Sequence, residues 1–211
     1  MQPNAEQQYW LNHIAASSAM HVIGVDECGA GAWAGDVTVC AAVTRKGWSH
    51  HQVRDSKVVS PATRARLVED VLVHPEVPYF VILSNPAKTI DSVGLRQAID
   101  ECVSQAVELC LMQFPDAPIV MDGNVRPAKV PTRTVCFPKA DNFVPAVSAA
   151  SILAKEHRDA YMREQHELYP HYAFDRNVGY GTEAHQLGLD EHGPCPIHRF
   201  SFGPLRKFMV R

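Results

Sequence analysis

Val22-Ile-Gly-Val-Asp26-Glu27-Cys-Gly-Ala-Gly-Ala-Trp-Ala-Gly-Asp36 joins a short apolar run to two adjacent carboxylates and then to a glycine-rich loop. Apolar residues that deliver charge at a strand end often belong to a site, because a buried unpaired carboxylate is costly. Glycines let the main chain approach a ligand or adopt a positive φ. Neighbouring strand residues point to opposite faces. Asp26 and Glu27 can therefore serve one centre only if the strand ends or bends there, or if one acts through its main chain. An exposed acidic pair before a turn is the alternative.

The composition is that of an ordinary globular domain. The chain has 211 residues, 46% of them apolar, and a net charge of −3. No window resembles the apolar run of about 20 residues that spans a membrane, and the first twenty residues lack the pattern of a signal peptide. The six cysteines include no C-x-x-C pair, which argues against a zinc knuckle or a disulfide framework. We therefore expect a cytoplasmic protein with reduced cysteines, no membrane association and a monomeric state.

The chain order predicts an α/β fold in which a mixed central sheet is flanked by helices. Strands come first as hairpins and then alternate with helices. Residues 1–21 are expected to form a lead-in, and residues 22–211 one domain with a small helical C-terminal extension. Strands are expected at Val22–Asp26, Val37–Thr44, Tyr79–Leu83, Pro118–Asp122 and Thr132–Phe137, with another considered near Arg45–His51. Helices are expected at Gln7–Ala16, Pro61–Val73, Asp91–Phe114, Val147–Leu168 and Thr182–Glu191.

Four carboxylates follow apolar strands or lie at strand-to-loop edges: Asp26, Glu27, Asp122 and Asp141. In an α/β sheet such edges can converge on one crevice. Hard oxygen ligands suit Mg²⁺ or Mn²⁺ better than zinc. A pair of such ions held by shared carboxylates is an apparatus for phosphodiester hydrolysis. Taken singly, Asp122-Gly-Asn124 reads as a turn and Asp141 as a helix cap, but the repeated pattern favours a metal site.

Seven segments in order resemble ribonuclease HII, and the match runs from Val22 to Phe202. They are Gly24-Val-Asp26-Glu27-x-Gly29-x-Gly31, Asp55-Ser56-Lys57-x-x-Ser60, Asp122-Gly123-Asn124, Lys139-x-Asp141, Ala149-Ala-Ser-Ile-Leu-Ala-Lys155-x-x-Arg158-Asp159, Gly179-Tyr180-Gly181-Thr182-x-x-His185 and Gly193-Pro194-x-Pro196-Ile197-His198-Arg199-x-Ser201-Phe202. The resemblance implies a ribonuclease H-like fold and cleavage of RNA in RNA–DNA hybrids or at single ribonucleotides in duplex DNA, as in ribonucleotide excision repair. It also implies dependence on Mg²⁺ or Mn²⁺, and 3′-hydroxyl and 5′-phosphate products.

Carried over by position, the resemblance makes the four carboxylates the catalytic and metal-binding set. Tyr180 corresponds to a tyrosine that stacks on the deoxyribose beside the ribonucleotide. Gly29, Ala30 and Gly31 correspond to a glycine–arginine–glycine loop whose backbone reaches the 2′-hydroxyl, the group that separates RNA from DNA. Contacts to substrate phosphates are expected from Lys57, Lys139, Lys155, Arg158, His198 and Arg199. Asp159 is interpreted as a helical salt-bridge partner, and Cys28 and Cys136 as structural thiols.

Three positions depart from the family pattern. Ala30 replaces the loop arginine, Asp36 replaces a proline and Ala140 replaces a glycine. The first two changes suggest weaker substrate binding or an altered junction preference. Two alternatives stay open: a DNA-structure-specific nuclease of the same superfamily, and a catalytically impaired protein that binds RNA–DNA hybrids. The Tyr180 motif argues against the first and the four carboxylates against the second, since crowded like charges repel without a metal.

Overall fold

The computed structural model describes residues 2–49, 61–124 and 126–208, and these contain a five-stranded sheet in the order β3-β2-β1-β4-β5. The strands are β1 (His21–Cys28), β2 (Val37–Arg45), β3 (Tyr79–Asn85), β4 (Ile119–Asp122) and β5 (Val135–Phe137). β2 pairs antiparallel with β1 and β3, whereas β4 is parallel to β1 and to β5. The predicted mixed sheet is therefore confirmed.

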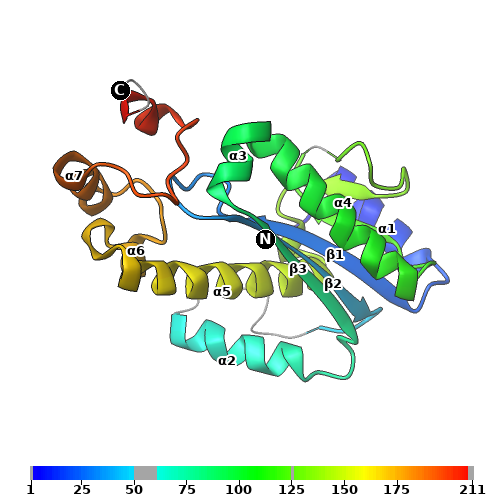
Figure 1. The fold of residues 1–211 in the computed structure, drawn as a ribbon. Helices are drawn as coiled ribbons and strands as arrows, with labels where there is room; N and C mark the ends of the chain where they lie inside the picture. Colours follow the sequence, from blue (N-terminus) through cyan, green and yellow to red (C-terminus); the bar gives the residue numbers. More distant parts are fainter. Residues whose placement is uncertain (1, 50–60, 125, 209–211) are drawn as a thin grey trace.

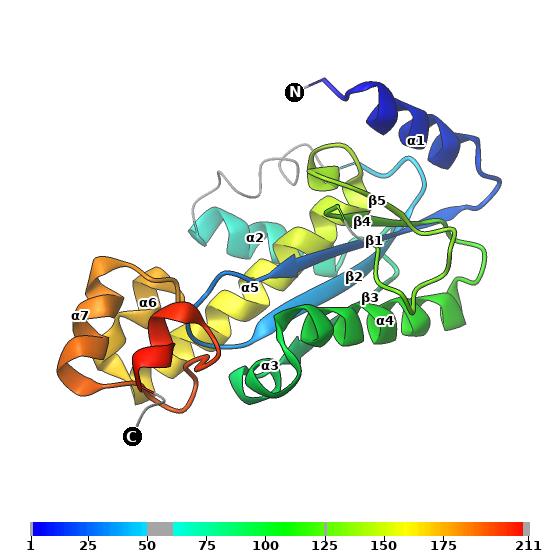
Figure 2. The same cartoon turned by 90° about the horizontal axis from the view of Figure 1, so that it is seen from above.

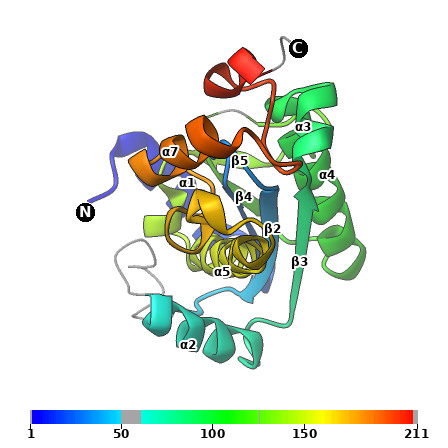
Figure 3. The same ribbon diagram turned by 60° about the vertical axis from the view of Figure 1, so that its left-hand side comes forward.

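Helices cover both faces of the sheet. The longer ones are α1 (Ala5–Ala16), α2 (Pro61–Leu72), α3 (Ala87–Val93), α4 (Leu95–Gln113), α5 (Pro145–Leu168) and α7 (Glu183–His192). α5 and α2 lie on one side of the sheet, and α4 with α3 on the other (Figures 1 and 2). Figure 3, which looks nearly along α5, shows the sheet between α5 and α4.

Close contact between β1 and α5 depends on a glycine. A Cβ atom built on Gly24 would lie 2.1 Å from the main-chain carbon of Ala146 and 2.2 Å from the nitrogen of Val147. Only a residue without a side chain permits this approach. Small buried residues of α5, among them Ala149 and Ala150, pack against the same face of the sheet. This spacing sets how close α5 lies to the end of β1 that carries Asp26 and Glu27.

The helix expected from Asp91 to Phe114 is wrong at its start. The structure has two helices, α3 and α4, separated by Gly94 at φ 88°. Asp91 lies inside α3, and its carboxylate accepts hydrogen bonds from the main-chain nitrogens of Phe200 and Ser201, both at 2.9 Å. That acidic side chain therefore anchors the C-terminal segment. The strand considered near Arg45–His51 is also absent from its described part, residues 46–49, beyond the last residue of β2.

The C-terminal part adds short helices at the end of β1. They are η3 (Pro170–Tyr172), α6 (Phe174–Asn177), α7 and η4 (Gly203–Phe208), and they lie beyond the end of the sheet (Figure 2). Their core includes Met162, Phe174, Leu189 and Leu205. Within residues 2–49, 61–124 and 126–208, no helix is long and apolar enough to span a membrane.

Candidate active site

Two of the predicted carboxylates lie at the same ends of neighbouring parallel strands. In the pairing of β1 with β4, Val25 faces Met121, so Asp26 and Asp122 follow at the next position of each strand. β1 does not end at Asp26 as expected; it continues to Cys28. The main-chain N–H of Glu27 donates to Asp26 Oδ1 at 2.8 Å. Glu27 therefore contacts the Asp26 carboxylate through its main chain.

These carboxylates line a cavity of about 380 Å³ between the sheet, α2 and α5. Its lining residues are Asp26, Glu27, Cys28, Arg64, Asp122, Ser151, Lys155 and Tyr180. The two cationic side chains on its wall, Arg64 and Lys155, form ion pairs with acidic side chains of α5. Lys155 Nζ lies 2.5 Å from Asp159 Oδ1, and Arg64 Nη2 lies 2.7 Å from Asp159 Oδ2. The predicted role of Asp159 as a salt-bridge partner is therefore confirmed.

Asp26 is a buried acid of the cavity with a raised pKa. Its side chain is buried, with 5% of the residue exposed. Burial raises the pKa of the Asp26 carboxyl to about 8, and the nearby charges of Asp122 and Glu27 add to the effect, while a hydrogen bond from Ser151 opposes it. A divalent cation among these oxygens favours the ionised carboxylate and supplies the missing positive charge. The donor set fits Mg²⁺ or Mn²⁺.

Asp141 lies next to this set in η2 (Ala140–Asn142). The N–H of Ala140 donates to Asp122 Oδ1 at 2.9 Å, and Asn142 Nδ2 donates to Asp141 Oδ1 at 3.0 Å. Asp141 is not among the described residues that line the cavity, and no three acids, histidines or cysteines within the described ranges form a ready-made metal cage. Ala140 has no positive φ, so alanine fits there without backbone strain.

Three of the residues expected to contact phosphate are buried supports instead. Arg158 and Arg199 are both 0% exposed. Arg158 donates to the carbonyls of Asp36, Val178 and Ala34 at 2.8, 2.8 and 3.1 Å. Arg199 donates to the carbonyls of Gly35, Gly29 and Ala30 at 2.9, 2.8 and 3.1 Å. The expected phosphate contacts are wrong for these two arginines, because both side chains are fully buried and hold main-chain carbonyls of the substrate loops.

His198 is likewise buried, with its Nε2 2.9 Å from Nε2 of His185. Its ring is inaccessible to a phosphate in this structure, so that expectation is also wrong. Lys139 is exposed, and Lys155 is partly exposed on the cavity wall. Lys57 and its Asp55–Ser60 motif lie outside the described residues.

Tyr180 and the glycine loop meet at the rim of the cavity. Tyr180 is 39% exposed, and a Cβ atom on the exposed Gly31 would lie 3.6 Å from its ring. The Arg158 guanidinium carbon lies 5.8 Å from the centre of the same ring. The N–H groups of Trp33 and Ala34 donate to the carbonyl of Gly179, which joins the two loops. Tyr180, Gly29, Ala30 and Gly31 therefore belong to one structural unit.

Asp36 is placed differently from the expectation. Burial raises the pKa of its carboxyl, against the hydrogen bond from Tyr161 and the charges of Arg158 and Arg199 that lower it. The carboxylate therefore offsets buried arginine charge and is absent from the lining of the cavity. Of the two changes expected to weaken substrate binding, only Ala30 therefore remains next to the proposed substrate.

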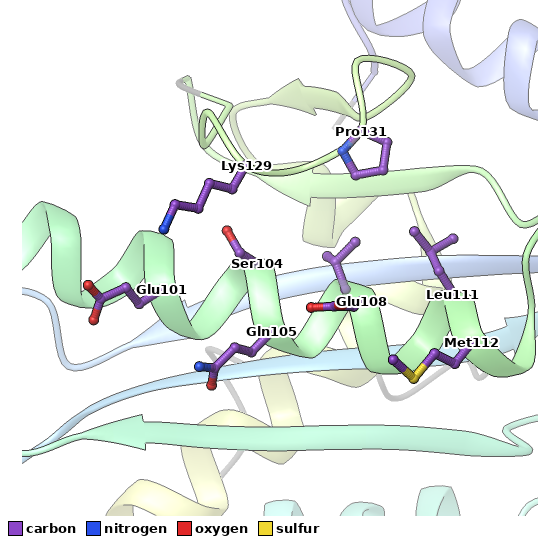
Figure 4. Close-up of a pocket in the computed structure, with 9 residues that line it drawn as sticks. Glu101, Ser104, Gln105, Glu108, Leu111, Met112, Lys129 and Pro131 are labelled. Atoms are coloured by element: carbon purple, nitrogen blue, oxygen red, sulfur yellow. The ribbon is translucent and has the colours of Figure 1, made fainter.

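Sequence reasoning missed Arg64 and Ser151, although both line the cavity. Ser151 lies within a motif quoted above, whereas Arg64 gives no local pattern beyond an amphipathic helix. A larger hollow of about 670 Å³ lies along the outer side of α4, where Figure 4 shows Glu101, Gln105 and Glu108 below Lys129 and Pro131. It lies apart from the carboxylates of β1 and β4.

The six cysteines are free, as expected. Burial raises the pKa of the Cys28 thiol, which lines the cavity, and also that of Cys136. Both thiols are therefore poor nucleophiles at neutral pH, because the thiolate is the reactive form.

Comparisons with known proteins identify the family of the chain. The family model described as Ribonuclease HII matches residues 23–204. A ribonuclease HII of Thermus thermophilus is 41% identical over 191 residues, which cover 90% of each chain. The crystal structure of ribonuclease H2 from Pyrococcus horikoshii superposes with a TM-score of 0.69 at 24% identity, covering 89% of this chain and 96% of the other. Bst-RNase HIII, solved in complex with Mn²⁺, gives a TM-score of 0.69 at 17% identity, covering 93% and 71%. The chain therefore belongs to the ribonuclease HII family and is a ribonuclease H, an endonuclease that acts on RNA–DNA hybrids.

Proposed function

We propose that this ribonuclease cleaves beside single ribonucleotides in duplex DNA as well as within RNA–DNA hybrids, and leaves 3′-hydroxyl and 5′-phosphate ends. The observation that carries the proposal is one cavity with two features. Asp26 and Asp122 lie at matching positions of the neighbouring strands β1 and β4, and Tyr180 lies on the rim of the cavity with Gly31 beside its ring. One bound substrate can therefore contact both the carboxylates and the flat ring of Tyr180, which can test the shape of a sugar.

Asp26, Glu27, Asp122 and Asp141 are the proposed metal ligands. When bound there, Mg²⁺ or Mn²⁺ supplies an activated water and stabilises the leaving oxygen of the phosphodiester. The protein keeps the acids in place: Ser151 and the Glu27 N–H bind the Asp26 carboxylate, and the Ala140 N–H binds that of Asp122. The choice of ion agrees with Bst-RNase HIII, which was solved in complex with Mn²⁺.

Substrate binding is proposed to use the glycine loop, Tyr180 and three lysines. The exposed Gly31 leaves room for a sugar next to the Tyr180 ring. Lys139 and Lys155 are the proposed phosphate contacts among the described residues, and Lys57 is proposed from its motif alone. Arg158 and Arg199 are proposed to act through the loop carbonyls that they hold, not through substrate phosphates.

A cleavage assay tests the proposal. Two labelled duplexes, one all-DNA and one with a single ribonucleotide, are compared with a uniform RNA–DNA hybrid in Mg²⁺, Mn²⁺ or chelator. We expect a metal-dependent cut beside the ribonucleotide and none in the all-DNA duplex. Cutting of the all-DNA duplex would favour the DNA-structure-specific nuclease. Binding of the hybrid without any cut would favour the catalytically impaired binder.

Restoring the loop arginine should strengthen substrate binding. In Ala30→Arg, a cation is added at a partly exposed position of the loop, and we expect the KM for the single-ribonucleotide duplex to fall by about threefold to tenfold, with a steeper dependence on salt. Ala30→Gln is the matched control, because it adds a long polar side chain without charge. Equal KM values for Ala30→Arg and the parent protein would show that the loss of arginine is not limiting.

A further inference from the structure

Two buried histidines connect the main chain of Tyr180 to the C-terminal segment. His185 in α7 and His198 are almost fully buried, with their Nε2 atoms 2.9 Å apart. His185 Nδ1 lies 3.0 Å from the carbonyl oxygen of Tyr180. At the other end, the main-chain nitrogen of Cys195 lies 2.9 Å from His198 Nδ1. These groups form one continuous line of hydrogen bonds.

The Tyr180 carbonyl fixes where the protons of two neutral rings lie. A carbonyl can only accept, so the His185 proton is on Nδ1 and its Nε2 is free to accept. His198 Nε2–H therefore donates to His185 Nε2, which leaves Nδ1 of a neutral His198 as an acceptor. That nitrogen lies 2.9 Å from the Cys195 main-chain nitrogen, which donates, and 3.2 Å from the Cys195 carbonyl oxygen, so the shorter contact is the one that the relay uses. A second proton on either ring would add an N–H that has no acceptor along this line.

The surroundings favour uncharged rings. Aromatic side chains enclose the pair. Tyr172 and Phe174 lie against both imidazoles, and the ring centres of Trp33 and His185 are 5.6 Å apart. Burial lowers the pKa of His185, and it lowers that of His198 to about 4, with the neighbouring His185 adding to the effect. The titratable groups that face the pair, Cys195 and Tyr172, are neutral near pH 7 because burial raises their pKa values.

We propose that His185 and His198 are positioning residues, a neutral hydrogen-bond relay that holds the Tyr180 main chain so that its ring can test the substrate sugar. This inference rests on the proposed junction reading by Tyr180. The relay is well placed for such a role, because the neighbouring Val178 has a φ of 43°, which is strained for a β-branched residue. A loop with such a conformation needs support from outside, and the Tyr180 carbonyl receives it from His185 of α7, in addition to the local N–H of Thr182 at 2.8 Å.

Two substitutions at His185 separate positioning from packing. The amide of His185→Asn reaches the position of Nδ1 and can still donate to Tyr180. The amide of His185→Gln reaches the position of Nε2, so it keeps the link to His198 but loses the donor to Tyr180. The measured quantity is kcat/KM for the single-ribonucleotide duplex divided by kcat/KM for the uniform hybrid. We expect this ratio to fall about tenfold in His185→Gln and less in His185→Asn.

The matched control is His192→Gln, which makes the same change at an exposed position of α7. It should leave the ratio as in the parent. In a Tyr180→Ala background, adding His185→Gln should not lower the ratio further, because the relay acts through Tyr180. Equal ratios in His185→Gln and the parent, or a greater loss in His185→Asn than in His185→Gln, would overturn the proposal. A parent that shows no preference between the substrates would instead contradict junction reading itself.

Nitrogen NMR of the histidine rings tests the relay without any activity. We expect His198 as the Nε2–H tautomer and His185 as the Nδ1–H tautomer at pH 7. Their lowered pKa values keep both rings neutral as the pH falls through 6.5, the ordinary value for histidine, and only stronger acid protonates them. A ring that titrates near pH 6.5, or the same tautomer in both rings, would refute the relay.

Discussion

Replacing Asp26 by asparagine should abolish cleavage and at the same time stabilise the metal-free protein. We expect kcat/KM to fall by at least about 10³-fold on both substrates, because a neutral amide is a poor ligand for the proposed cation. In chelator at pH 7.5, the free energy of unfolding should rise by about 2 kcal/mol, since the buried carboxyl that Asp122 and Glu27 repel is replaced by an uncharged group. Denaturant unfolding and single-turnover cleavage measure the two effects.

Adding Mn²⁺ gives the third part of this test. The cation should raise the melting temperature of the parent protein and leave that of Asp26→Asn nearly unchanged, because a ligand stabilises only the state that binds it. Asp116→Asn is the matched control, an exposed aspartate before the other end of β4. It should change neither activity nor stability. An Asp26→Asn protein that is less stable than the parent in chelator would show that the carboxylate has a structural role instead.

A loss of activity together with a gain in stability distinguishes a functional acid from a structural one. An aspartate that stabilises a fold is paired or capped, and its loss lowers stability and activity together. Asp26 receives hydrogen bonds from Ser151 and Glu27 but also faces two other carboxylates inside one cavity. Such an arrangement costs stability unless a cation completes it, which is the expected trade-off at a catalytic site.

The carboxylates could be found from sequence because their pattern is local. An apolar strand followed by an acid occurs at Asp26 and again at Asp122, and each element can be recognised without knowing its partners. The register between β1 and β4 then places both acids at one edge. The break between α3 and α4 at Gly94 was missed because apolar residues at helical spacing continue across it. Helical periodicity describes one face of a helix and says little about where the chain bends.

The roles of the basic residues could not be found in this way. A sequence gives the charge of Arg158, Arg199 and His198 but not their burial, which depends on segments more than a hundred residues away for both arginines. A lysine or arginine in a nuclease suggests a phosphate contact by default. Here both guanidinium groups instead satisfy carbonyls of the glycine loop. The loop has glycines where side chains would collide with this support: a Cβ on Gly29 would lie 2.0 Å from Arg158 Nε.

Arg158→Met should be among the most destabilising single substitutions in this protein. The change keeps a long apolar side chain but removes all the donors that reach Asp36, Val178 and Ala34. Their carbonyls would be buried without partners, and the nearby Asp36 carboxyl would lose a compensating charge. We expect the free energy of unfolding to fall by about 3–5 kcal/mol, the range for breaking a buried ionic network. Urea denaturation of the metal-free protein measures it.

Arg163→Met is the matched control, because Arg163 is in the same helix but its side chain is 47% exposed and pairs with Glu156. Its loss should cost less than about 1 kcal/mol. Below both unfolding transitions, Arg158→Met should also lose preference for the single-ribonucleotide duplex, because Arg158 supports the glycine loop at Ala34 and Asp36 and the Tyr180 loop at Val178. If the two methionine variants were equally stable, the carbonyl contacts of Arg158 would be dispensable, and the joint support of the two substrate loops would have to come from Arg199 and the main-chain bonds between Gly179 and residues 33–34.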